Sequence, residues 1–313
     1  MTAPRITWLA HDAASRRVLE LATKVAPTPT TVLVTGESGC GKDQLARLIH
    51  ESSPRRDSPY LKIDCASLPP ELVESELFGH EKGAFTGAVE RKLGRLEIAR
   101  GGTIVLDEVA ALAPAIQSKL LRVIEERTFE RLGGTDTLRI DARLIALTNA
   151  DLERLVAAGC FREDLFHRLN VFTIAVPPLR QRPADILPLA DELRGRLAAV
   201  HARVGIAFDA AARRLLQTYS WPGNIRELKN AIEHALVFSS DAVLRPEHFP
   251  DHIRSAGPLP GGAQGPLRSL EDIERDAIAA TLEATRYKIS KSAEILGISR
   301  KTLLEKRKKY GLG

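Results

Sequence analysis

The stretch 36–43 constrains the fold of this chain more than any other. It reads Gly-Glu-Ser-Gly-Cys-Gly-Lys-Asp and follows 31–35, a run of β-branched and apolar residues that predicts a buried parallel strand. Apolar residues recur at helical spacing after it, beginning at Leu45. A strand, the pattern Gly-x-x-x-x-Gly-Lys and a helix together indicate a phosphate-binding loop, in which backbone N–H groups and the helix N-terminus surround phosphates.

Each residue of this loop is a candidate for nucleotide binding. The set is Gly36, Glu37, Ser38, Gly39, Cys40, Gly41, Lys42 and Asp43. We expect Lys42 to reach the β- and γ-phosphates. Asp43 stands where the general pattern has a metal-binding Ser or Thr, and we count it as a candidate metal ligand. Cys40 is interpreted as a small residue that fills the loop, with redox control as the alternative. A Gly-rich turn without a ligand is the alternative for the whole stretch.

Polar residues also follow two later apolar strands. The run 101–108 ends in Asp107 and Glu108, and the strand 142–147 ends in Thr148 and Asn149. We expect Asp107 to hold Mg²⁺, Glu108 to orient the attacking water and Asn149 to sense the γ-phosphate. The alternative is a buried strand that simply ends at a polar surface.

Strands alternate with helices up to residue 180, which predicts an α/β fold with a doubly wound parallel sheet. The expected elements are helices at 13–25, 69–78, 114–126 and 161–169, strands at 60–64 and 172–176, and a hairpin at 129–140. No strand pattern appears in 184–254, where helices are expected at 186–200, 210–219 and 225–238. We therefore expect a core at 1–180, a helical lid at 181–254, a Gly- and Pro-rich linker at 255–269 and a helical unit at 270–313.

Basic charge is concentrated in that last unit. Residues 286–310 hold nine Lys and Arg against two Glu, whereas the net charge of the whole chain is +5. A short helix, a Gly-containing turn and an N-capping Ser299 before a basic helix predict a helix-turn-helix that binds DNA. The candidate DNA contacts are Ser299, Arg300, Lys301, Thr302, Glu305 and Lys306. A basic tail without DNA binding is the alternative.

Composition excludes several other classes. No apolar run is long enough to span a bilayer, and residues 1–10 do not form a signal peptide. Three scattered cysteines do not make a disulfide framework or a zinc site, which fits a reducing cytoplasm. We expect a cytoplasmic protein.

The loop 83–88, Gly-Ala-Phe-Thr-Gly-Ala, surrounds one aromatic residue with small ones and is interpreted as a contact loop, with a core position for Phe85 as the alternative. Together with 76–80 (Glu-Leu-Phe-Gly-His) and 221–228 (Trp-Pro-Gly-Asn-Ile-Arg-Glu-Leu), it resembles the sigma-54-dependent transcriptional activators, or bacterial enhancer-binding proteins. The C-terminal unit resembles the Fis-type helix-turn-helix of that family.

The resemblance implies an AAA+ ATPase that uses ATP and Mg²⁺ and assembles as a ring, usually a hexamer, of one subunit type or two. Such a ring remodels RNA polymerase carrying sigma-54 from an upstream site on double-stranded DNA. The residues implied to contact sigma-54 are Gly83, Ala84, Phe85, Thr86, Gly87 and Ala88. Arg162 and Arg168 are implied to be candidate arginine fingers, and Arg226 the second sensor. Surface ion pairing with Glu163 and Asp164 is the alternative for the two candidate fingers.

The short region before the phosphate loop resembles the phage-shock and Hrp activators, which implies a separate regulatory protein acting in trans. Asp64 stands where studied members have an Asn that holds the catalytic Glu. If Asp64 faced Glu108, two carboxylates would repel or share a proton, and Asp64→Asn would lower basal hydrolysis. Arg307 stands where the motif usually packs a Leu. Its stem is expected to lie along the core, with an early end of the recognition helix as the alternative.

Two other functions stay open. One is a DNA-binding repressor in which nucleotide only controls oligomerisation, and the other is an AAA+ motor that acts on DNA itself. Two features argue against the repressor: the complete contact loop around Phe85 and Thr86, and the intact set of Lys42, Asp107, Glu108 and Arg168. The same contact loop has no role in a motor that acts on DNA.

Overall fold

The computed structural model describes residues 8–201, 203, 205–255, 270–285 and 287–311. The chain divides into two units, Met1–Gly257 and Pro258–Gly313. The predicted linker at 255–269 lies outside the described residues except for Ser255. Within the described part of the chain, no helix is both long and apolar enough to span a membrane.

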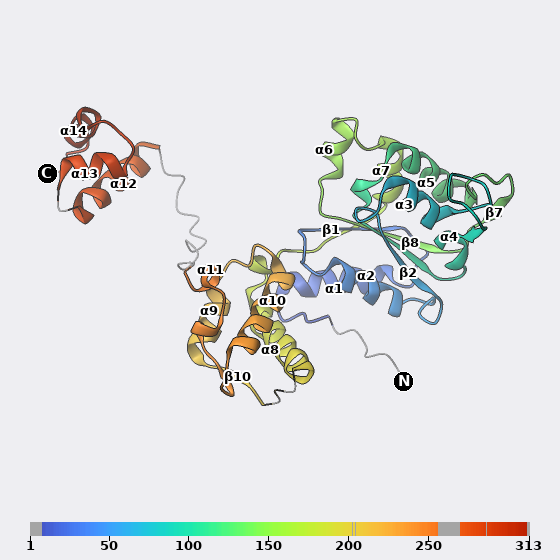
Figure 1. Cartoon of the computed structure of the whole chain (residues 1–313), viewed down its shortest axis with the longest axis horizontal. Coiled ribbons are helices and arrows are strands. Elements are labelled where there is room, and N and C mark those ends of the chain that lie inside the picture. The colour runs from blue at the N-terminus through green and yellow to red at the C-terminus, as the bar shows by residue number, and fades with distance from the viewer. Residues whose placement is uncertain (1–7, 202, 204, 256–269, 286, 312–313) are drawn as a thin grey trace. The chain divides into compact units, whose positions relative to one another are not determined.

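The first unit is built on a five-stranded sheet in the order β2-β5-β8-β1-β9. Strands β1, β2 and β8 of this sheet are labelled in Figure 1. All neighbouring strands are parallel, which confirms the predicted doubly wound α/β fold. The strands are β1 (Val32–Thr35), β2 (Tyr60–Asp64), β5 (Thr103–Asp107), β8 (Arg143–Thr148) and β9 (Phe172–Ala175). Because parallel strands end at the same edge, the polar residues that follow β1, β5 and β8 lie along one edge.

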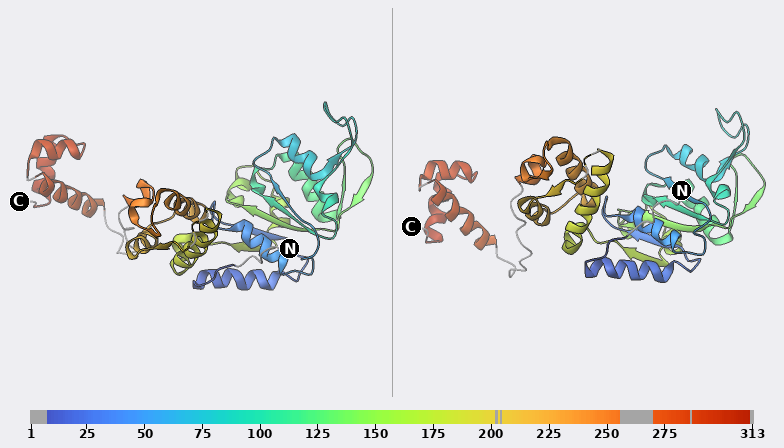
Figure 2. Two further views of the ribbon diagram at one scale, coloured as in Figure 1. Left: turned by 60° about the horizontal axis from the view of Figure 1, so that its bottom comes forward. Right: turned by 90° about the horizontal axis from the view of Figure 1, so that it is seen from below.

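Helices cover both faces of this sheet (Figure 2). On one face, α1 (Ala13–Val25) and α2 (Lys42–Glu51) pack against the sheet through side chains such as Val18 and Leu45. On the other face, α3 (Pro70–Phe78), α5 (Pro114–Glu126) and α7 (Glu163–Leu169) bury apolar residues that include Leu120. Shorter elements here are α4 (Arg95–Ile98), η1 (Val109–Ala111) and α6 (Leu152–Ala157).

The contact loop and the predicted hairpin are fixed to each other at their bases. The loop lies between β3 (Gly79–His80) and β4 (Lys92–Leu93), and the hairpin consists of β6 (Thr128–Glu130) and β7 (Thr137–Arg139). The N–H of Glu81 donates to the carbonyl of Leu132 at 3.0 Å. The buried Arg131 guanidinium pairs with Glu81 at 2.8 Å and with Glu97 at 2.9 Å.

The lid contains the three expected helices, α8 (Pro183–Val200), α9 (Ala210–Thr218) and α10 (Asn224–Phe238). The expectation of no strand in this region is wrong, because β10 (Ala207–Phe208) pairs in parallel with β11 (Val243–Leu244). Two residues per strand are too few to produce an alternating pattern in the sequence. The short elements η2 (Leu179–Gln181), η3 (Pro246–His248) and α11 (Asp251–Arg254) complete the lid.

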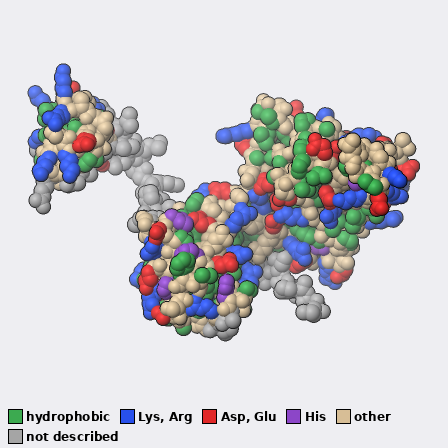
Figure 3. Space-filling model, viewed as in Figure 1, with side chains coloured by type: hydrophobic (Ala, Val, Ile, Leu, Met, Phe, Trp, Pro, Cys, Tyr) green, Lys and Arg blue, Asp and Glu red, His purple; other side chains and the backbone are tan. Residues whose placement is uncertain are grey.

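The second unit consists of α12 (Leu270–Ala284), α13 (Ile289–Ile295) and α14 (Arg300–Lys309) around a small core that includes Leu282 and Leu303. Gly297, with φ 65°, lies in the turn between α13 and α14. The Ser299 hydroxyl accepts the Thr302 N–H at 3.1 Å, so the predicted N-cap is confirmed. Lys and Arg side chains gather on the visible face of this unit (Figure 3).

Candidate active site

The phosphate loop joins β1 to α2 and needs its glycines. Gly39 has φ 76°, and a Cβ there would lie 2.6 Å from the carbonyl oxygen of Gly223 in the lid. Lys42 is buried, and its Nζ donates to the carbonyls of Gly36 at 2.8 Å and Glu37 at 3.3 Å. The ammonium group is therefore held inside the curl of the loop.

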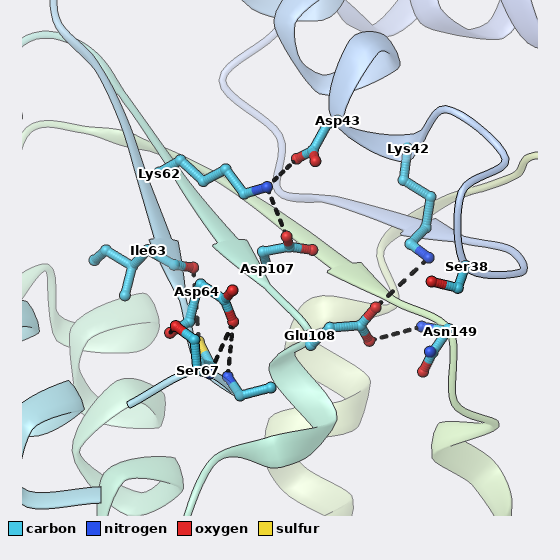
Figure 4. A network of polar contacts seen from close by, with 12 residues as sticks. Ser38, Lys42, Asp43, Lys62, Ile63, Asp64, Ser67, Asp107, Glu108 and Asn149 are labelled. Carbon is cyan, nitrogen blue, oxygen red and sulfur yellow. Dashed lines mark hydrogen bonds and ion pairs between the residues drawn. The ribbon is translucent and has the colours of Figure 1, made fainter. Parts of the chain in front are cut away.

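The strand ends bring the predicted catalytic residues to this loop (Figure 4). Glu108 follows β5 in the left-handed region, with φ 54°. Its Oε1 lies 3.7 Å from Lys42 Nζ, and its Oε2 accepts the backbone N–H of Asn149 at 3.0 Å. The phosphate loop, the acid pair at the end of β5 and the residue after β8 therefore lie together.

The two candidate metal ligands share one partner that the sequence analysis did not identify. Lys62 Nζ lies 2.6 Å from Asp43 Oδ1 and 2.6 Å from Asp107 Oδ2 (Figure 4). Burial alone would lower the pKa of Lys62, but the hydrogen bonds to Asp107 and Asp43 raise it overall. The group between the two carboxylates is therefore a cation.

A magnesium ion fits this pair of carboxylates. Among the described residues there is no group of three or more acidic, His or Cys side chains arranged to hold a metal. Magnesium does not need one, since it usually binds one or two carboxylates, waters and the phosphates of its substrate. Asp43 and Asp107 supply hard oxygen ligands that already share one cation.

Asp64 is bonded to its own turn rather than to Glu108 in this structure. Its Oδ1 accepts the N–H groups of Ala66 and Ser67, both at 3.0 Å, and closes the turn after β2. Glu108 is held instead by Lys42 and Asn149. The geometry on which the expected effect of Asp64→Asn depended is therefore not found here.

The lid holds the phosphate loop from the other side. Asn224 is fully buried, and its Nδ2 donates to Glu37 Oε2 and to the Ser38 carbonyl, both at 3.1 Å. Hydrogen bonds from Arg180 and then Asn224 lower the pKa of Glu37 to about 2. The predicted second sensor, Arg226, donates to the Ser38 hydroxyl at 2.7 Å.

Cys40 is fully buried in the loop, and this burial raises the pKa of its thiol. A buried, protonated thiol reacts slowly with oxidants. The environment therefore supports the interpretation of Cys40 as a space-filling residue.

The two candidate arginine fingers have partners outside the phosphate loop. Arg162 pairs with Asp164 at 2.7 Å, and Arg168 pairs with Glu125 at 2.8 Å. Both arginine side chains are about half exposed, at 46% and 59%. Their contacts lie on α5 and α7, so the structure does not bring them into the site of their own chain.

Phe85 lies at the tip of the contact loop with 42% of its surface exposed. The loop closes on itself, because the Gly83 N–H donates to the Ala88 carbonyl at 2.8 Å. On its covered side, the Phe85 ring meets His80 edge-on, with the ring centroids 5.0 Å apart. The exposed fraction supports a surface position for Phe85 rather than a core position.

In the second unit, three candidate DNA contacts on α14 are exposed, namely Arg300, Lys301 and Glu305. Thr302 is half-buried beside Ser299. Lys306 pairs with Glu274 of α12. The Arg307 guanidinium lies 5.9 Å from the centre of the Tyr287 ring, over an aromatic side chain.

Three residues of the site were not predicted from the sequence: Lys62, Arg180 and Asn224. Lys62 had a signal, since it is a basic residue in the predicted strand 60–64. Arg180 had none, because its partner Glu37 is 143 positions away and only the fold brings the two together.

Comparison with known families agrees with this site. Residues 8–175 match the sigma-54 interaction domain, 180–264 match the AAA+ ATPase lid domain, and 269–310 match the Fis family of bacterial regulatory proteins. The structure superposes on NtrX from Brucella abortus in complex with ADP with a TM-score of 0.75, at 33% identity, over 98% of this chain and 70% of that one.

Curated relatives are similar over most of this chain. The nitrogen fixation protein VnfA of Azotobacter vinelandii is 44% identical over 94% of this chain and 57% of its own length. The alginate biosynthesis regulatory protein AlgB of Pseudomonas aeruginosa is 45% identical over 96% of this chain and 67% of its own length. The chain thus spans about three fifths to two thirds of the length of these relatives. It belongs to the sigma-54-dependent transcriptional activators, with an AAA+ ATPase domain, its lid and a Fis-type helix-turn-helix.

Proposed function

We propose that the protein is an ATP-dependent transcriptional activator that binds upstream DNA and remodels sigma-54 RNA polymerase so that the promoter opens. The observation that carries this proposal is the presence, in one unit, of an assembled nucleotide site and an exposed aromatic loop. A nucleotide switch alone would need the first feature but not the second.

The proposed roles in hydrolysis follow from the positions of the side chains. Lys42 binds the β- and γ-phosphates, Glu108 orients the attacking water, and Asn149 senses the γ-phosphate. Asp107 and Asp43 hold Mg²⁺, which when bound neutralises charge on the phosphates. The pairing of Glu108 with Lys42 holds its carboxylate at the phosphate loop before the substrate arrives.

We assign the completion of the site to a neighbouring subunit in a ring, expected to be a hexamer. Arg162 and Arg168 are about half exposed and lie outside the nucleotide site of their own chain, which is compatible with a finger supplied in trans. A finger of this kind contributes about 10³–10⁵ in rate in comparable enzymes.

Mixing inactive subunits tests this assignment. Lys42→Ala subunits still present Arg168, and Arg168→Ala subunits still have an intact nucleotide site. Mixed rings should therefore hydrolyse ATP although each variant alone does not. If the mixtures were as inactive as the separate variants, Arg168 would not be the finger supplied by the neighbouring subunit. The same test applies to Arg162.

The second unit is proposed to bind upstream double-stranded DNA through the exposed start of α14, where Ser299 fixes the helix end. The proposed partners, DNA and polymerase, place the protein in the cytoplasm. Regulation by a separate protein stays a prediction, and the ring is predicted to contain either one subunit type or two. Purification of the ring from its native host under mild conditions, followed by identification of bound proteins, tests both.

An open-complex assay tests the proposed function. It contains sigma-54 polymerase, a supercoiled promoter with its upstream site, ATP and either wild type or Phe85→Ala. Phe238→Ala is the matched control, because Phe238 is 68% exposed on the lid, away from the contact loop. We expect open complexes with wild type and Phe238→Ala only. Unwinding of DNA without polymerase would indicate a motor on DNA, and repression without opening would indicate the repressor.

A further inference from the structure

The polar network at the ends of β2 and β5 contains one cation to which the proposed reaction gives no role. Lys62 lies in the middle of β2, yet its ammonium group reaches Asp43 at the start of α2 and Asp107 at the end of β5, at 2.6 Å from each (Figure 4). A single side chain therefore joins the helix that follows the phosphate loop to the strand that carries the catalytic acids.

The same two carboxylates are the proposed ligands of Mg²⁺. Magnesium binds carboxylate oxygens at about 2.0–2.1 Å. An ammonium group donates hydrogen bonds to the same lone pairs, so one oxygen cannot serve both cations at full strength. The two positive charges also repel each other across a short distance.

The exposure of the three side chains shows which contact can open. Asp43 is 55% exposed and Lys62 is 35% exposed, whereas Asp107 is 16% exposed. Water can solvate the ammonium group when it leaves a carboxylate, so Lys62 has a place to go without an unpaired buried charge. No rearrangement of the sheet is needed, because only the flexible end of the lysine moves.

We propose that Lys62 is a positioning residue that sets the metal affinity of the site: it holds Asp43 and Asp107 together before metal binds and releases at least one of them when Mg²⁺ arrives with ATP. The identity of the metal rests on the proposed function. The consequence is that free Mg²⁺ binds poorly, because the phosphates of ATP are needed to offset the competing ammonium group.

Mn²⁺ binding to the full chain tests the proposal. It is measured as the loss of the electron paramagnetic resonance signal of the free ion. Lys62→Met removes the charge and keeps the length of the side chain. We expect this variant to bind Mn²⁺ about tenfold more tightly than wild type, both alone and with a non-hydrolysable ATP analogue. Removing one positive charge at contact distance in a partly exposed site changes the affinity for a cation by about this factor.

Two matched variants separate this role from a general effect on the fold. Lys62→Arg keeps the cation and should retain the wild-type Mn²⁺ affinity. Lys119→Met makes the same charge change at another half-exposed lysine, which pairs with Glu74 at 2.8 Å, and should also match wild type. Equal Mn²⁺ affinity of Lys62→Met and wild type would overturn the proposal.

A measurement on the wild type does not depend on any variant folding. Lysine acylation read by mass spectrometry should label Lys62 more strongly with Mg²⁺ and the ATP analogue than with EDTA and the same analogue. Equal labelling would mean that metal does not release Lys62. Neither readout contains polymerase or DNA, so the two proposals can fail separately. If only the proposed function failed, no open complexes would form, but Lys62→Met would still bind Mn²⁺ more tightly than wild type.

Discussion

Asn224→Ala tests how firmly the lid is fixed to the phosphate loop. The Asn224 side chain is fully buried, and its Oδ1 accepts the Leu179 N–H at 2.7 Å. Alanine leaves that buried N–H without its acceptor, which costs about 1–3 kcal/mol. It also removes a hydrogen bond to the Glu37 carboxylate, worth about 1 kcal/mol because Glu37 is partly exposed.

Backbone conformation adds to this cost. Residue 224 has φ 54°, which Asn tolerates and which costs Ala about 1–2 kcal/mol. We therefore expect Asn224→Ala to lower the free energy of unfolding of the lid and phosphate loop by about 4 kcal/mol. Asn224→Gly should recover about 1 kcal/mol of it, because Gly adopts this conformation without strain.

Urea unfolding followed by tryptophan fluorescence measures this change. The two tryptophans of the chain, Trp8 and Trp221, are both buried in the first unit. Asn230→Ala is the control, since Asn230 lies on the same helix and is exposed, and its expected change is below about 0.5 kcal/mol. If Asn224→Ala unfolded at the same urea concentration as Asn230→Ala, the lid contacts would not stabilise the loop as argued.

Three further predictions concern single side chains. The pKa of Glu37 is lowered from 4.5 to about 2, so the carboxylate stabilises the fold above pH 4.5 and this contribution is lost as the pH falls toward 2. In urea unfolding at pH 7, the free energy of unfolding of wild type should exceed that of Glu37→Gln by up to about 1 kcal/mol. This difference should disappear near pH 2. Asp64→Asn should leave basal ATP hydrolysis unchanged in a phosphate-release assay, because Asn Oδ1 accepts the same turn N–H groups. Ser299→Ala should destabilise the second unit by about 1 kcal/mol in thermal unfolding and weaken DNA binding in a filter assay, and an unchanged melting temperature would contradict the capping argument.

The elements that the sequence predicts correctly are those with a strong local pattern. The apolar run before the phosphate loop becomes β1, and the amphipathic stretch 114–126 becomes α5 with the expected bounds. Ser299 was predictable as an N-cap because its partner is only three residues away. In each case the sequence signal and the stabilising interaction lie within a few residues of each other.

What the sequence does not reveal depends on residues far apart in the chain. The pairing of Glu37 with Arg180 crosses from the core to the lid, and no local pattern reports it. The sequence places Lys62 in a strand, but the direction of its side chain depends on the register of β2 with β5. Asp64 is a different case, because its partners Ala66 and Ser67 are local, and the expected contact with Glu108 came from its place in the family motif rather than from the turn that it closes.

The coupling of ATP hydrolysis to promoter opening is the central claim, and permanganate reactivity of promoter thymines measures it most directly. With sigma-54 polymerase, the upstream site and wild-type protein, we predict reactive thymines around the transcription start with ATP and none with a non-hydrolysable analogue. Glu108→Gln should bind ATP and leave the promoter closed. Equal reactivity with the analogue, or with polymerase that lacks sigma-54, would contradict the account.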